Sequence, residues 1–214
     1  DFNNILAAIL GYTELSLEAT QDDSQLHSDL TKIFTAGNRA RDLISQILTF
    51  SRQHEQEKKP ILIAPIIKES LKLLRASLPT SIDIRQDIGQ ELMETVLADP
   101  TQIHQVIMNL CTNAGHAMRN KGGILEVSLI KVELDSVFCL DHPGLTPGPH
   151  IKLTVSDTGH GIKPDILPRI FEPYFTTKEK SGGTGLGLSV VHGIITDCGG
   201  IITVYSEVGK GTTF

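Results

Sequence analysis

The first 58 residues contain two glycines, Gly11 and Gly37, and no proline, so little in them would interrupt a long helix. Apolar and small residues in the second half of this stretch recur at alternating steps of four and three. Such a heptad pattern is typical of a helix packed along a long partner. The positions are Leu26, Leu30, Ile33, Gly37, Ala40, Ile44, Ile47 and Ser51.

A second apolar stripe lies earlier, between Phe2 and Leu17, and the polar segment 19–24 after it has the character of a helix–helix turn. The two stripes predict a helical hairpin over residues 1–58. Two helices with wide apolar faces cannot bury those faces alone, so we expect two copies of the chain to form a four-helix bundle. In the alternative, the hairpin packs against the rest of its own chain.

From about residue 59 the sequence changes to alternating short strands and helices, after a charged stretch 54–60 that reads as a linker. Asp99 and Pro100 are a typical helix start, with an N-cap followed by proline at the first helical position. The predicted fold class is α+β, with the hairpin at 1–58 and an α/β domain at 59–214. The predicted strands are 82–84, 125–129, 151–155 and 201–205, the helices 66–78 and 99–119, and a Pro/Gly-rich loop covers 141–149.

The composition excludes several classes of protein. Twenty-five acidic residues against 19 basic ones leave a net charge of −6, which argues against a general nucleic-acid binder. The three cysteines lie far apart, so neither a disulfide framework nor a structural zinc site is expected. No apolar run approaches the roughly 20 residues that span a bilayer. We therefore expect this chain to work in a reducing compartment, the cytoplasm.

Three segments carry candidate chemistry, and the first lies on the helix predicted from Asp99. Asn109, Asn113 and His116 are spaced by four and three residues, which places them along one edge of that helix. Amide oxygens at the edge of a core face are suitable ligands for a hard cation such as Mg²⁺. In the alternative, the asparagines only hydrogen-bond neighbouring loops.

The second segment, Asp157-Thr-Gly159-His-Gly161, directly follows a predicted strand. A carboxylate at a strand end could accept a hydrogen bond from an exocyclic amine, and the two glycines would let the backbone approach a planar ligand closely. An ordinary strand-to-loop turn would have the same composition.

The third segment is the glycine run 182–188, which leads into the apolar stretch 189–195. Glycines before a helix N-terminus can form a phosphate cradle, because free N–H groups and the helix dipole both favour anions. The polar residues 176–183 in front of it have the composition of a lid. The spacing matches neither a dinucleotide-binding fingerprint nor a Walker A loop.

The order of these segments resembles the sensor histidine kinases of two-component signalling. Residues 109–113, 157–161, 170–178 and 183–187 look like the N, G1, F and G2 boxes of that family, and residues 209–214 look like its closing strand. The resemblance implies an α/β sandwich of the histidine kinase, gyrase and chaperone type, which holds ATP and Mg²⁺ under a mobile lid.

The resemblance also implies roles for individual residues. Asn113 would be the Mg²⁺ ligand, and Asn109 would assist at the metal or the phosphates. Asp157 would accept a hydrogen bond from the adenine amine, with Thr212 behind it through a water molecule. The other residues implied to bind the nucleotide are His116, Gly159, Gly161, Phe175, Thr177, Lys178, Gly185, Leu186, Gly187 and Leu188.

At the other end of the chain, Asp1-Phe-Asn-Asn4-Ile-Leu looks like the segment that follows the phospho-accepting histidine of this family. The acceptor is then expected immediately before Asp1, and the sequence is expected to be a fragment of a longer protein. Asp1 would be the base of phosphotransfer, and Asn4 would act when the partner is dephosphorylated. The implied partners are a second copy of the hairpin and a response-regulator receiver domain, with any membrane attachment outside this fragment.

Two other functions fit parts of the pattern. ATPases of the gyrase, mismatch-repair and chaperone type share the nucleotide fold, but they usually carry a glutamate where Asn109 stands and lack the segment that begins at Asp1. A dimerisation scaffold with a degenerate nucleotide site would need no catalysis at all. Release of free phosphate would favour the first alternative, and absence of nucleotide binding would favour the second.

Overall fold

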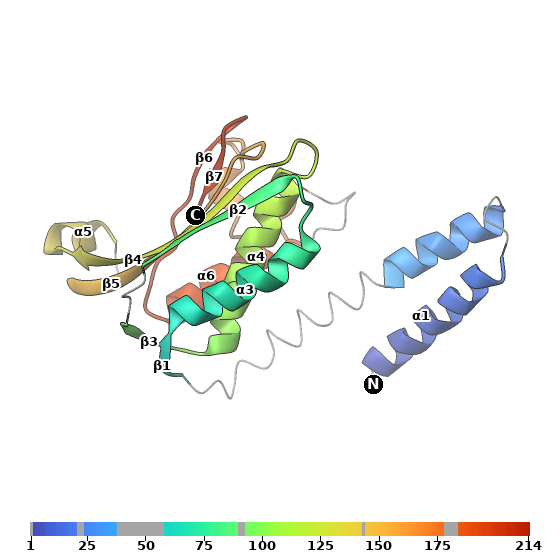
Figure 1. The fold of residues 1–214 in the computed structure, drawn as a ribbon, viewed down its shortest axis with the longest axis horizontal. Helices are drawn as coiled ribbons and strands as arrows, with labels where there is room; N and C mark the ends of the chain where they lie inside the picture. Colours follow the sequence, from blue (N-terminus) through green and yellow to red (C-terminus); the bar gives the residue numbers. More distant parts are fainter. Residues whose placement is uncertain (1, 21–23, 38–57, 90–92, 143, 178–183) are drawn as a thin grey trace. The chain divides into compact units, whose positions relative to one another are not determined.

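The computed structural model describes residues 2–20, 24–37, 58–89, 93–142, 144–177 and 184–214 (Figure 1). The chain divides into two compact units. The first comprises Asp1–Gln56 with Thr177–Thr184, and the second comprises Glu57–Thr176 with Gly185–Phe214. We call them the helical unit and the α/β unit and describe each by itself.

The helical unit contains the predicted hairpin as far as the structure describes it. Helix α1 spans Phe2–Glu18, and residues 25–37 form the second helix. The hydroxyl of Ser24 accepts a hydrogen bond from the backbone N–H of His27 at 3.0 Å, which caps that second helix. The predicted seam positions Ala40, Ile44, Ile47 and Ser51 lie outside the described residues, as does most of the predicted linker.

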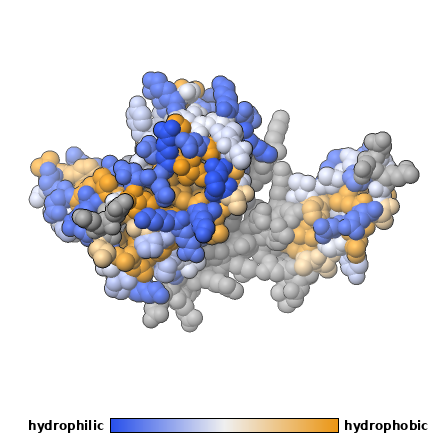
Figure 2. Space-filling view, viewed as in Figure 1, coloured by the Kyte–Doolittle hydropathy of each residue, from blue (hydrophilic) through white to orange (hydrophobic). Residues whose placement is uncertain are grey.

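The apolar stripe of the hairpin is largely uncovered within the described residues of this unit. Leu10 and Thr13 are buried, and Gly37 lies against Leu10, since a side chain at Gly37 would come within 2.7 Å of Leu10 Cδ2. Tyr12 and Leu15, in contrast, expose 74% and 62% of their surface. Figure 2 shows such hydrophobic residues on the surface of the helical unit.

The α/β unit is built on a five-stranded sheet in the order β2-β4-β5-β7-β6. Strands β2 and β4 are parallel, and the other neighbouring pairs are antiparallel. A separate two-stranded sheet pairs β1 with β3. The strands are β1 Lys59–Leu62, β2 Ile82–Ile88, β3 Thr95–Ala98, β4 Gly123–Leu134, β5 Gly148–Asp157, β6 Tyr205–Glu207 and β7 Gly211–Thr213.

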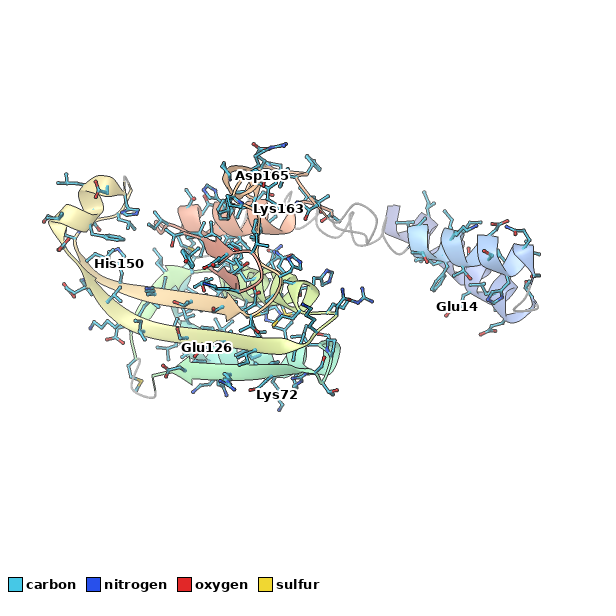
Figure 3. The ribbon with its side chains drawn as sticks, turned by 90° about the horizontal axis from the view of Figure 1, so that it is seen from above. Glu14, Lys72, Glu126, His150, Lys163 and Asp165 are labelled. Atoms are coloured by element: carbon cyan, nitrogen blue, oxygen red, sulfur yellow. The ribbon has the colours of Figure 1, made fainter. Side chains whose placement is uncertain are left out.

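Helices α3 (Ile63–Ser77), α4 (Pro100–Ala117) and α6 (Gly187–Asp197) cover one face of the five-stranded sheet (Figures 1 and 3). The core lies between these two layers and includes Leu74, Ile107, Leu125, Val127 and Ile194. Alternate residues of β4 face this core, as expected for a strand covered on one side.

The start of α4 agrees with the sequence prediction. Asp99 is the N-cap, and its side chain accepts a hydrogen bond from the N–H of Thr101 at 2.7 Å, a contact that contributes about 1 kcal/mol in typical helices. Pro100 occupies the first helical turn, where its missing N–H costs nothing. The cap therefore fixes the register of the helix that carries Asn109 and Asn113.

The predicted strand 201–205 is wrong in most of its length. Strand β6 begins only at Tyr205, which pairs with Thr213, so residues 201–204 run past the last paired residue of β7 and have no ladder partner among the described residues. An extended apolar sequence becomes a strand only where a neighbouring strand accepts its hydrogen bonds.

Three further features differ from the sequence prediction. The loop predicted at 141–149 is shorter, because helix α5 (Ser136–Asp141) ends at its start and β5 begins at Gly148. Pro60, predicted to end the linker, lies in β1 opposite Leu97. Helix α5 and the β1–β3 sheet have no counterpart in the sequence prediction.

Candidate functional site

The end of strand β5 places a buried carboxylate where the sequence predicted a binding group. Asp157 exposes 7% of its surface, and its Oδ1 accepts a hydrogen bond from the N–H of Gly159 at 2.8 Å. A polar group is stable in such surroundings only when it is hydrogen-bonded. The bond also curls the chain directly after the strand, so that residues 158–161 form a tight loop.

Two glycines in this loop are required by close backbone approaches. A side chain on Gly159 would come within 2.6 Å of Ala117 Cβ, at the end of α4. Gly161 has φ of 70°, and a side chain there would collide with the carbonyl of Glu207. The N–H of His160 also donates to the carbonyl of Ala117 at 3.3 Å. The loop therefore lies between the end of α4 and the β6–β7 turn.

Thr212 lies beside Asp157. The two residues are direct partners in the β5–β7 ladder, so their side chains lie on the same face of the sheet. Thr212 is also buried, with 5% of its surface exposed. Its hydroxyl is 2.9 Å from the hydroxyl of Ser206 on β6.

Ser206 was not identified from the sequence. The sequence nevertheless contains a signal for Ser206. Gly209 and Gly211 lie between Ser206 and Thr212 and are typical of a hairpin turn, which would place Ser206 opposite Thr212.

Helix α4 carries the predicted asparagines. Asn109 and Asn113 are half-buried along the same edge of the helix, and His116 one turn further is exposed. A side chain on Gly187, the first residue of α6, would lie 3.5 Å from Oδ1 of Asn109. The amide of Asn109 therefore lies next to the N-terminal end of α6.

The N-cap residue of α6 is Leu186, whose side chain makes no cap hydrogen bond, and neither Gly187 nor Leu188 carries a polar side chain. The first N–H groups of a helix have no partner within the helix, and the helix dipole makes this end attractive to anions. The N-terminal end of α6 thus combines backbone donors with a neighbouring amide oxygen from Asn109.

The glycine run is packed against the segment that precedes it. Gly185 has φ of 69°, and a side chain there would collide with the backbone of Tyr174, itself a non-glycine residue with φ of 65°. The guanidinium of Arg169 lies 4.5 Å from the ring centre of Phe175 and forms an ion pair with Glu172 at 3.0 Å. The contacts of Arg169 fix the shape of residues 169–175, and Tyr174 places this segment against Gly185.

The remaining predicted residues are placed as follows. Phe175 is half-buried, and Thr177 is exposed. Lys178 and Asp1 lie outside the described residues, and Asn4 lies in α1 with its side chain outside the description. Within the described ranges there is no cluster of three or more His, Cys, Asp or Glu side chains suited to a metal ion.

Cys111 lies on the same helix, between the two asparagines, but its chemistry differs from theirs. The side chain is completely buried, and burial raises the pKa of its thiol to about 12. A thiol with so high a pKa is a poor nucleophile and packs as a small apolar group.

Comparison with known proteins identifies both parts of the chain. Residues 98–214 match the family of histidine kinase-, DNA gyrase B-, and HSP90-like ATPases, and residues 1–56 match the His Kinase A (phospho-acceptor) domain. The chain belongs to this ATPase family and, through the combination of the two domains, to the sensor histidine kinases of two-component systems.

Individual relatives agree with this assignment. The chain is 38% identical to the sensor kinase CckA of Brucella abortus (strain 2308) and 32% identical to the sensor histidine kinase ZraS of Salmonella typhimurium, in both cases over its whole length. It spans 22% of the first protein and 42% of the second.

Among solved structures, full-length ShkA in complex with AMPPNP matches the whole chain with a TM-score of 0.69 and 26% identity, over 42% of its own length. The catalytic domain of the histidine kinase ThkA matches 74% of the chain with a TM-score of 0.56 and 28% identity, over 94% of its own length. ThkA in complex with the response regulator TrrA, at 23% identity, supports the fold only, with a TM-score of 0.64. Among the described residues of the chain, no helix is long and apolar enough to cross a membrane.

Proposed function

We propose that this chain is the catalytic core of an ATP-dependent protein histidine kinase. In this proposal it phosphorylates a histidine immediately before Asp1 and passes the phosphoryl group to an aspartate of a response-regulator receiver domain. The observation that carries the proposal is the convergence of three distant segments. Helix α4 contacts the loop after the buried Asp157 through Ala117 and the start of α6 through Asn109, in an ATPase-family fold.

The base of the nucleotide is assigned to the end of β5. Asp157 accepts a hydrogen bond from the exocyclic amine of adenine, and Thr212 supports it from the neighbouring strand through a water molecule. Gly159 and Gly161 support this assignment indirectly. A side chain at either would collide with Ala117 or Glu207, so the glycines let the loop pack against the chain and keep Asp157 at the end of β5.

The phosphates are assigned to the start of α6 and the edge of α4. The first N–H groups of α6, those of Gly187 and Leu188, have no acceptor within the helix, and the helix dipole favours an anion at this end. Asn113 offers an amide oxygen to Mg²⁺, and Asn109 assists at the metal or the phosphates. Mg²⁺ usually takes few protein ligands and completes its shell with water and phosphate oxygens, which agrees with a site built from amides.

Residues at the margin of the site complete the assignment. His116 and Lys178 contribute positive charge or donors toward the phosphates. Phe175, Thr177 and the segment from Gly185 to Leu188 shape the region under the proposed lid. When bound, Mg²⁺ would neutralise the charge that develops on the transferred phosphoryl group, and the chain's own residues would hold the nucleotide in line with the acceptor.

The helical unit supplies the acceptor side of the reaction. Asp1, next to the acceptor histidine, accepts its ring proton and holds the tautomer in which the other nitrogen can attack. Asn4 acts in dephosphorylation of the receiver domain. The exposed stripe that includes Tyr12 and Leu15 supports a homodimer, in which two copies bury these side chains in one four-helix bundle.

We also propose the compartment of the cell in which this reaction takes place. ATP and receiver domains are found in the cytoplasm, where we place this part of the protein, with any membrane attachment provided by segments outside it. No nucleic acid is needed as a partner, in agreement with the net charge of −6.

The test adds a histidine directly before Asp1 and follows label from γ-labelled ATP. We expect an acid-labile, base-stable phosphoprotein that disappears in Asn113→Ala, while the matched variant Asn120→Ala, just beyond α4, remains labelled. Label that persists in Asn113→Ala would remove the metal role of that residue. Release of free phosphate without protein labelling would favour an ATPase of the gyrase type, and absence of ATP binding would favour a scaffold.

A further inference from the structure

His192 is an exposed residue of α6 that contacts the segment in front of the glycine run. It follows Gly187, the first residue of the helix, by five positions, which is more than one helical turn. The centre of its ring lies 5.5 Å from that of Phe171, and the two ring planes are tilted by 44°. Contacting aromatic rings typically lie about 4.5–7 Å apart, so the two side chains are in direct contact.

The ring of Phe171 has a second ring contact, with Phe214. The two ring centres lie 6.5 Å apart, and the rings meet edge to face at 75°. Phe214 is itself fixed to the sheet, because its N–H donates to the carbonyl of Val155 on β5 at 2.8 Å and its carbonyl accepts from the N–H of Val155 at 2.9 Å. Phe171 therefore connects the sheet to α6, and His192 provides the contact on the side of the helix.

The segment that begins with Phe171 also contacts the turn directly before α6. Hydrogen-bonded turns fix its path, since the N–H of Phe175 donates to the carbonyl of Glu172 at 3.2 Å. The backbone of Tyr174 lies against Gly185, where a side chain would collide with it. The segment thus contacts α6 twice, once through His192 and once through the turn that leads into its first residue.

The conformation of this turn determines where the first N–H groups of α6 point. Gly185 has φ of 69°, and glycine has little conformational preference of its own, so contacts from outside the turn must hold its shape. A site that has the binding conformation for only part of the time binds its ligand more weakly by that fraction. Loss of the contact at Phe171 should therefore weaken the binding of an anion at Gly187 and Leu188.

We propose that His192 is a positioning residue for the phosphate-binding end of α6. By holding Phe171, it keeps the segment up to Tyr174 against Gly185, and the turn then directs the first N–H groups of the helix toward the phosphates. The inference rests on the proposed binding of the nucleotide phosphates at the start of α6. His192 itself touches no nucleotide and acts only through Phe171.

A second contact between a histidine and a phenylalanine provides a matched control. His142, directly after α5, stacks on Phe138 with ring centres 4.3 Å apart and planes inclined by 18°. Both residues lie between β4 and β5, in a part of the chain to which no nucleotide contact is assigned. His142→Ala therefore removes a contact of the same kind away from the proposed site.

Two substitutions of His192 separate the ring contact from other effects. His192→Ala removes the ring at an exposed helical position, where alanine favours the helix, so the variant should fold. His192→Phe keeps an aromatic ring that can contact Phe171 and serves as the rescue variant.

The experiment titrates the isotope-labelled 214-residue chain with ADP and with adenosine, which carries no phosphate, and follows the amide signals by NMR. In His192→Ala we expect the dissociation constant of ADP to rise about threefold to tenfold and that of adenosine to change less than about twofold. His192→Phe should bind ADP within about twofold of the unmodified chain, as should His142→Ala.

The amide signals of the chain without nucleotide give a second readout. In His192→Ala we expect the signals of Gly187 and Leu188 to shift or broaden, because the turn before them is no longer held. The signal of Gly159, at the end of β5, should stay unchanged, and His142→Ala should alter none of the three. This readout decides even if adenosine binds too weakly to be titrated.

An unchanged dissociation constant of ADP in His192→Ala would overturn the inference, and so would equal losses for ADP and adenosine. Loss of ADP binding in His192→Phe as large as in His192→Ala would exclude the ring contact as the cause. If the unmodified chain does not bind ADP, the proposed function fails, while the signals of Gly187 and Leu188 still show whether His192 holds the turn. Normal binding of ADP with no effect of His192 would remove only the role of His192.

Discussion

In the helical unit, Tyr12 and Leu15 expose most of their surface, whereas Leu125 and Val127 in the α/β unit are completely buried. The α/β unit encloses its apolar residues between one sheet and three helices. The described part of the hairpin buries little beyond Leu10 and Thr13. The difference indicates that the α/β unit is stable by itself, while the hairpin needs further apolar surface, which we assign to a second copy.

The glycines of the two units differ in the same way. Gly161, Gly185 and Gly211 have positive φ, and a side chain at each would meet neighbouring backbone atoms. A side chain at Gly11 in α1 would meet nothing within 4 Å. The site therefore contains glycines packed against backbone atoms, whereas a side chain at Gly37 in the hairpin would meet only the side chain of Leu10.

The largest effect is expected for Gly211→Ala. Gly211 has φ of 125°, and an added side chain would collide with the carbonyl oxygen of Asp157. Backbone strain and overpacking together should lower the free energy of unfolding of the α/β unit by about 3 kcal/mol or more. Chemical denaturation followed by circular dichroism measures the change, and a loss below about 1 kcal/mol would contradict the geometry.

A second variant addresses the hairpin. Leu15→Glu places a charge on the exposed stripe, which costs the isolated chain little and a dimer much, because the carboxylate would lose its water in the bundle. We expect the dimer dissociation constant to rise at least tenfold in sedimentation equilibrium. The control Glu14→Gln, at an exposed position next to it, should leave the constant unchanged. An unchanged dimer dissociation constant in Leu15→Glu would show that the dimer does not bury this stripe, as expected if the hairpin packs on its own chain.

The two cysteines Cys111 and Cys139 of the α/β unit should differ in their rates of alkylation, which is a smaller effect. Because burial raises the pKa of Cys111 to about 12, its thiol should resist alkylation by iodoacetamide at pH 8, while the less buried Cys139 reacts. We expect at least a tenfold difference in labelling rate, read by mass spectrometry. Equal rates would show that the core around α4 opens readily.

The raised pKa of Cys111 also makes the stability of the α/β unit depend on pH. The folded-state pKa of Cys111 lies above its value of 9.0 in the absence of burial, so the unfolded chain loses this proton first as pH rises. The contribution of the protonated Cys111 thiol to the free energy of unfolding is complete below about pH 9 and is lost progressively toward pH 12. Cys111→Ala should remove this part of the alkaline decline and add the cost of a small cavity at neutral pH.

The smallest effect is expected for Gly11→Ala. An alanine in the middle of α1 has room and lowers the entropy cost of forming the helix. We expect a gain of about 0.5–1 kcal/mol, measured at a fixed protein concentration. A loss of stability would show that the dimer places another helix close to Gly11.

Much of this arrangement could be predicted from the sequence, for identifiable physical reasons. The Asp99–Pro100 start and the alternation in β4 are local signals that depend on neighbouring residues only. Asp157 and the glycines beside it were found from a local pattern at a predicted strand end, which an ordinary turn shares, in combination with the other glycine and asparagine segments.

The errors arose where long-range pairing decides the structure. Residues 201–204 have the composition of a strand but no partner for its ladder, and β1 forms because residues 95–98, distant in the sequence, supply one. Ser206 was missed although Gly209 and Gly211 gave a local hairpin signal. Its hydrogen bond with the N–H of Ile162 joins segments distant in the sequence, which no local pattern indicates.

The central claim is that the two units divide the reaction, with the acceptor on the hairpin and the nucleotide on the α/β unit. The direct test mixes two separate pieces with γ-labelled ATP and Mg²⁺. One is the hairpin 1–56 preceded by a histidine, and the other is the piece 57–214, which contains the α/β unit. The account predicts acid-labile label on the hairpin piece, only when both pieces are present and at a rate that rises with the concentration of the α/β unit. Label that stays on the α/β unit, or free phosphate with an unlabelled hairpin, would contradict it.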